Sequence, residues 1–144
     1  MSFFNLFQKK SADDHWKMYA RKMSSVAQDY AGDFHKTLDY SEKSIMELEE
    51  ILDWYSNDIA VSKPTDNQIW SMATIFGSYL GETLLKNGLS EKGFSWGTEG
   101  SSNIPLLRKQ DGTYLTPNDK VYKRLVKGRE DSVVSFYRFA TTQI

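Results

Sequence analysis

The chain has 144 residues, no cysteine and a formal net charge of −1, with 40% hydrophobic and 26% charged residues. This length fits one domain with a real hydrophobic core, and the lack of thiols excludes disulfides, thiol catalysis and thiolate metal sites. All apolar runs are shorter than the roughly 18 residues of a membrane span, so we expect a cytoplasmic protein without one.

Charge is unevenly distributed along the chain. Residues 1–60 contain seven Lys and Arg against eleven Asp and Glu, whereas residues 104–144 contain eight against four. Nucleic-acid-binding proteins usually carry a basic total. The split therefore favours internal complementarity between the two regions and argues against a nucleic-acid partner.

Residues 1–10 are expected to form a flexible N-terminal segment or a docked turn, since chain termini are usually mobile. The alternative is that Phe3, Phe4 and Phe7 touch a membrane surface. The first helix is predicted to start after Ser11, its N-cap, and to end at Gly32. Its apolar seam comprises Trp16, Ala20, Met23, Ala27 and Tyr30.

A second helix is predicted to open at Asp39, with Glu42 completing a capping box. Its inner face comprises Ile45, Leu48, Ile51, Leu52, Tyr55 and Ile59. Another capping box, Thr65 with Gln68, starts a central helix over residues 66–87, which Asn87-Gly88 should end in a left-handed cap.

The central helix is apolar nearly all round. Gly77 and Gly81 lie one turn apart on it, and each should cost about 0.8–1 kcal/mol relative to alanine. We expect another backbone or a flat aromatic side chain to approach them closely. A narrow polar stripe also runs along this helix and predicts either partial cover or the floor of a groove; it comprises Ser71, Thr74, Ser78 and Glu82.

Residues 88–100 are rich in glycine and predict a structured loop with a short strand around 94–96. Residues 104–115 predict a β-hairpin that turns at Asp111-Gly112. A fourth helix should begin at Thr116-Pro117 and stop at Gly128, and a last helix should cover residues 130–140. The fold class is thus α+β: one mostly helical domain over residues 1–144, with about five helices and a small antiparallel sheet near residues 104–115.

Gly93–Gly97 matches the G-x-S-x-G pattern of hydrolases around Ser95, but the expected strand–turn–helix context is absent. The only histidines, His15 and His35, both lie upstream, whereas that triad places its histidine downstream. We therefore expect no serine hydrolase, no metal site and no cofactor. Trp96 is expected to fold back onto the glycine face of the central helix.

Two surfaces are candidates for binding. The groove along the central helix would use Ser78, Tyr79, Glu82 and Trp96 to hold a small molecule or an anion. The fourth helix carries a basic stripe that could meet a partner, although a solvated face or pairing with the acidic second helix is the simpler interpretation. That stripe comprises Lys120, Lys123, Arg124 and Lys127.

The order of several motifs resembles a family of small uncharacterised bacterial domains. The motifs are GSYLGE (77–82), FSW (94–96), IPLL (104–107) and VYKRLVKGREDSVVSFY (121–137), and the resemblance covers residues 38–140. It implies a bacterial origin and a shared fold, but no activity. Together these observations predict a non-enzymatic, protein-binding module such as an immunity or inhibitor protein. The alternative is a regulatory domain that binds a small molecule or an anion along the central helix.

Overall fold

Five α-helices and a three-stranded antiparallel sheet make up the computed structural model, which describes the backbone of residues 3–144 and side chains from Asp13 onward. The helices are α1 (Phe3–Gly32), α2 (Glu42–Ser62), α3 (Asp66–Leu84), α4 (Pro117–Lys127) and α5 (Val133–Gln143). The strands are β1 (Ser95–Gly97), β2 (Leu106–Arg108) and β3 (Tyr114–Leu115). The α+β fold class is confirmed.

The first helix is longer than predicted. It begins at Phe3, so the expected N-cap at Ser11 is wrong: that residue lies within α1. No glycine or proline lies between Phe3 and Ala31, so nothing in the backbone stops the helix from extending. The alternatives for the side chains of Phe3, Phe4 and Phe7 lie outside the described residues.

The cap of α2 also differs from the prediction. Ser41, not Asp39, is the N-cap, and its side chain accepts a hydrogen bond from the amide of Ser44. The carboxylate of Asp39 instead accepts bonds from the amide and hydroxyl of Ser41, which lower the pKa of Asp39. The capping box of Thr65 and Gln68 at the start of α3 is confirmed.

The central helix ends in a π-helical turn, which the sequence did not predict. A π-helical turn, Leu85–Leu89, follows α3, and Gly88 adopts a φ of 130°, a conformation that favours glycine. The hairpin at Asp111-Gly112 is confirmed, with β2 and β3 paired antiparallel. The last helix starts later than predicted, because a short 3₁₀ turn, Arg129–Asp131, precedes α5 and Ser132 caps it.

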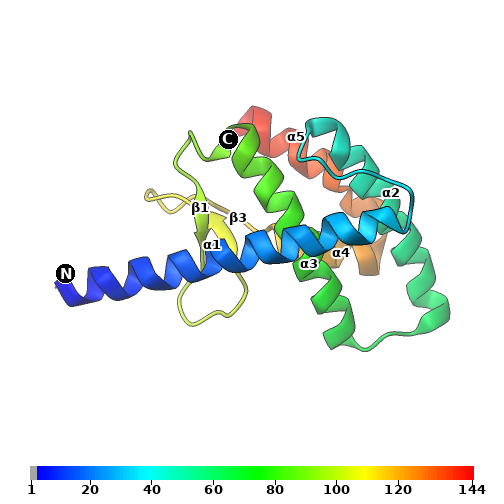
Figure 1. The fold of residues 1–144 in the computed structure, drawn as a ribbon, viewed down its shortest axis with the longest axis horizontal. Helices are drawn as coiled ribbons and strands as arrows, with labels where there is room; N and C mark the ends of the chain where they lie inside the picture. The colour runs from blue at the N-terminus through cyan, green and yellow to red at the C-terminus, as the bar shows by residue number, and fades with distance from the viewer. Residues whose placement is uncertain (1–2) are drawn as a thin grey trace.

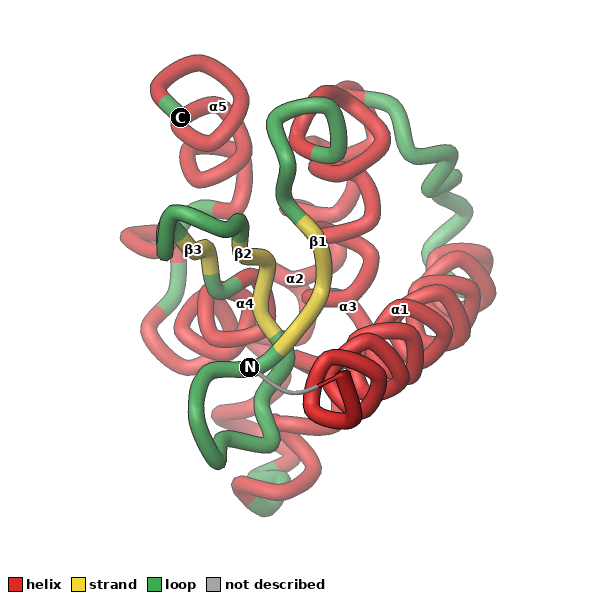
Figure 2. The backbone as a smooth tube through the Cα atoms, turned by 90° about the vertical axis from the view of Figure 1, so that its left-hand side faces the viewer, coloured by secondary structure: helices red, strands yellow, loops and turns green. Residues whose placement is uncertain are grey.

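Helix α3 lies at the centre of the fold. Its chief neighbours are α1 and α4, while α2 packs on α4 and α5. Figure 1 shows α1 crossing α3, and Figure 2 shows the sheet beside α1 with α2 behind it, on the far side of the molecule. Within the part of the chain that the structure describes, no helix is long and apolar enough to cross a membrane.

Candidate functional site

The glycines of α3 are contact points for two other elements. A Cβ atom at Gly77 would lie 2.6 Å from the Cα atom of Asn118, and one at Gly81 would lie 2.3 Å from two ring carbons of Trp96. One glycine thus meets a backbone and the other meets a flat aromatic ring. Both forms of the expected close approach are present, and Trp96 does fold back onto this helix.

Trp96 is held in place from both sides. It pairs with Leu107 across the β1–β2 ladder and is 1% exposed. Its Nε1–H donates a hydrogen bond to Oε2 of Glu82, one residue beyond the glycine that the ring covers, at 3.3 Å. The bare surface of Gly81 therefore lets the indole reach the carboxylate.

Glu82 and Trp96 line a pocket of about 290 Å³ between α1, β1 and the turn after α3. Lys17 and Arg21 of α1 and Lys86 of the turn also line it. The Glu82 carboxylate is 4.0 Å from Nε of Arg21. Of the four residues predicted to bind a small molecule, Glu82 and Trp96 line this pocket.

The other two predicted ligand residues, Ser78 and Tyr79, are buried at 1% and 0% exposure. The Tyr79 hydroxyl bonds with the hydroxyl of Ser44 and accepts a bond from the amide of Tyr40. Burial raises the pKa of this phenol. An accessible groove along the whole helix is therefore wrong, because neighbouring elements cover this part of α3 and leave a pocket at Glu82.

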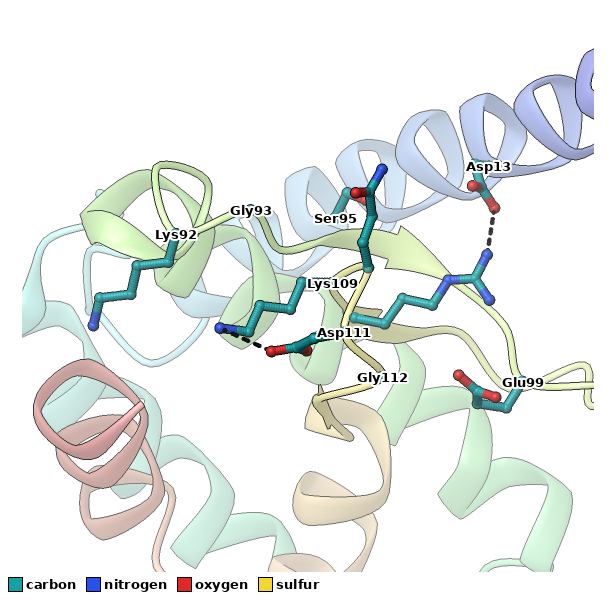
Figure 3. Close-up of a pocket in the computed structure, with 10 residues that line it drawn as sticks. Asp13, Lys92, Gly93, Ser95, Glu99, Lys109, Asp111 and Gly112 are labelled. Atoms are coloured by element: carbon teal, nitrogen blue, oxygen red, sulfur yellow. Dashed lines mark hydrogen bonds and ion pairs between the residues drawn. The ribbon is translucent and has the colours of Figure 1, made fainter.

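A larger cleft, of about 750 Å³, lies beside the sheet (Figure 3). Lys92 and Lys109 extend toward one end of it, and Asp13 and Glu99 lie at the other. Most of its charges meet an opposite charge: Arg108 pairs with Asp13, and Lys109 pairs with Asp111. These charges therefore neutralise one another within the chain and do not converge on one point in the cleft.

Ser95 lies in β1 and lines the cleft as well as the Glu82 pocket. On α1, His15 meets Trp16 edge-on and stacks with Tyr19, and His35 lies in the turn after that helix. Neither histidine hydrogen-bonds to Ser95 among the described side chains. No cluster of three metal-binding side chains occurs among the residues described.

The predicted basic stripe on α4 is mostly engaged within the fold. Arg124 is 1% exposed, so its placement on an exposed binding surface is wrong. Lys120 pairs with Asp131 at 3.1 Å and Lys123 pairs with Asp119 at 3.0 Å. Lys127 is exposed and forms no ion pair with the side chains of residues 13–144. One cation of four therefore remains for a partner.

Arg124 connects α4 to the acidic second helix. Its Nε donates to Glu49 at 2.7 Å and its Nη2 donates to Asp53 at 2.9 Å. Arg129 adds a two-bond contact to Asp53, and Arg129 and Arg124, in that order, hold the pKa of that carboxyl well below its usual range. This network is the internal complementarity that the uneven charge distribution predicted.

A surface that the sequence patterns did not single out lies on α2. Met46, Trp54 and Val61 are 57%, 53% and 81% exposed, and we call them the α2 apolar face. Their spacing of eight and seven residues places them within about 80° of one another around the helix, with the polar residues Glu50 and Asn57 between them. Helical periodicity could have identified them, because apolar residues outside the predicted inner face of this helix must lie on its outer side.

Comparison with protein-family models, with curated proteins and with solved structures finds no match to this chain.

Proposed function

We propose that this chain is a bacterial, cytoplasmic binding protein that acts through a protein partner seated on the α2 apolar face. The observation that carries the proposal is the exposed indole of Trp54. Tryptophan is enriched among the residues that dominate binding energy at interfaces. The non-enzymatic, immunity or inhibitor type of protein is the form of this function that we favour.

Trp54 is held in a defined orientation. Its ring lies 5.5 Å from that of Phe34 and 5.3 Å from that of Tyr55, with both pairs edge-on. A side chain fixed in this way loses little conformational freedom on binding. From Met46 to Val61 the face extends about 22 Å along the helix at 1.5 Å per residue. This length suits a macromolecule better than a metabolite.

The surroundings of the α2 apolar face are acidic. Glu47 and Glu50 share a single cation, Lys36, and Asp58 lies further along the helix. Exposed apolar side chains interspersed with carboxylates complement an apolar socket flanked by Lys and Arg. We therefore infer a basic partner surface, and α2 replaces α4 as the candidate interface.

Photocrosslinking tests this proposal. Benzoylphenylalanine placed at Trp54 should capture one partner in cells, whereas the same group at Met18, an even more exposed apolar residue on α1, should not. The captured protein is then purified, and its affinity is measured for wild type, Trp54→Ala and Met18→Ala. We expect Trp54→Ala to cost about 2 kcal/mol or more, and the affinity to fall with salt.

Equal affinity of wild type and Trp54→Ala would remove α2 as the interface. The immunity or inhibitor role has its own test, in which the captured partner is expressed alone and together with this chain. Toxicity that co-expression relieves supports that role. A harmless partner would refute it and leave the binding function standing.

A further inference from the structure

The Glu82 carboxylate has unused capacity for hydrogen bonds. Glu82 is 8% exposed, and the described residues give it one bond, from Trp96 at 3.3 Å, and one ion pair, with Arg21 at 4.0 Å. A carboxylate can accept about four bonds, and buried carboxylates are normally paired and well bonded. Its remaining lone pairs therefore suit a donor that enters the adjoining pocket.

The mouth of this pocket carries the opposite charge. Lys17 and Arg21 lie one turn apart on α1, and Lys86 approaches from the turn after α3, with Nζ 4.9 Å from the Tyr40 ring centre. The Arg21 side chain is 76% exposed, so its guanidinium is available for new bonds. A guanidinium binds a carboxylate through two parallel hydrogen bonds. Lys17 also pairs with Asp14 at 4.0 Å. The buried anion thus lies near two further cations, Arg21 and Lys86.

We propose that this pocket binds a free α-amino acid. The ammonium group would donate to Glu82, and the carboxylate, one carbon away, would accept from Arg21. A ligand with only a negative charge would be repelled by Glu82, and one with only a positive charge would be repelled by Arg21 and Lys86. The pocket volume of about 290 Å³ fits a molecule of this size, because it lies at the small end of ligand pockets.

Calorimetric titration of the whole chain with each of the twenty L-amino acids tests the proposal. Two modified forms of any amino acid that binds, the N-acetyl form and the carboxamide, each lack one charge. We expect both to bind about 10- to 100-fold more weakly, because hydrogen bonds to charged groups contribute that much to affinity. Glu82→Gln and Arg21→Gln should cause the same loss, while Lys22→Gln, an exposed cation on the same helix, should bind like wild type.

The indole N–H of Trp96 reports the location of binding. Its ¹H–¹⁵N resonance, assigned with Trp96→Phe, should shift on addition of the amino acid. If Glu82→Gln does not fold, Arg21→Gln carries the test, because that side chain is largely exposed. Binding by none of the twenty amino acids, or equal binding by Arg21→Gln, would overturn the proposal. Equal binding by the N-acetyl form would show an anion site instead.

This proposal does not depend on the protein partner. The pocket is lined by residues of α1, α3, β1 and the turn after α3, and none of the three residues of the α2 apolar face lines it. Failure of the titration therefore leaves the crosslinking test at Trp54 unaffected.

Discussion

Gly81→Ala probes the contact on which the Glu82 pocket depends. The added methyl group would lie 2.3 Å from two ring carbons of Trp96, more than an ångström closer than a normal contact. The ring is 1% exposed and packs against α3, so it cannot move aside freely. Overpacking of this kind costs about 1–3 kcal/mol, and we expect the upper part of that range.

Alanine also stabilises a helix by about 0.8–1 kcal/mol relative to glycine, which offsets part of this cost. The net loss in free energy of unfolding should be about 1–2 kcal/mol, measured from urea denaturation midpoints at unchanged slope. Gly32→Ala is the matched control, since no atom lies within 4 Å of its Cβ position at the end of α1. That variant should be as stable as wild type or slightly more so.

A double-mutant cycle with Trp96→Phe separates the contact from other effects. Phenylalanine lacks the outer ring carbons that the new methyl group would touch, so Gly81→Ala should cost at least about 1 kcal/mol less in that background. Additive losses within about 0.5 kcal/mol would refute the contact. Equal losses for Gly81→Ala and Gly32→Ala would refute it as well.

Three further predictions concern residues outside this contact. Arg124→Leu should lower the free energy of unfolding by about 3 kcal/mol. This is the low end for breaking a buried ion pair, because Glu49 and Asp53 are partly exposed to solvent. The control Lys127→Leu should change the free energy of unfolding by less than about 0.5 kcal/mol, and equal effects of the two variants would contradict the network. The pKa of Asp53 is lower in the folded protein than its unfolded value of about 3.8, so its ion pairs stabilise the fold above that pH. This stability is lost as pH falls toward the folded pKa. Asp53→Asn should therefore flatten the acid limb of a plot of urea midpoint against pH, and an unchanged limb would argue against the network. Ser95→Ala should leave any hydrolysis of esters and amides unchanged, because no histidine hydrogen-bonds to that serine in the described structure. Loss of hydrolysis in this variant would show that Ser95 acts as a nucleophile.

Several features of this protein follow from short stretches of the chain alone. The capping box at Thr65, the turn at Asp111-Gly112 and the stop at Gly128 each depend on neighbouring residues, and the structure contains all three. The spacing of Gly77 and Gly81 also predicted a close contact correctly, because glycine within a helix is costly unless something takes the place of the missing side chain. These were local inferences, and they succeeded where the cause is local.

The tertiary structure alone decided which polar residues are accessible. Arg124 reads as part of a basic stripe, yet α2 covers it with two carboxylates from 71 and 75 residues away. Ser78 and Glu82 share one face of α3, yet neighbouring elements bury the first while a pocket remains beside the second. Helical periodicity assigns a residue to a face. Whether that face meets water, a charge or a ring depends on segments distant in the sequence, whose docking no local pattern encodes.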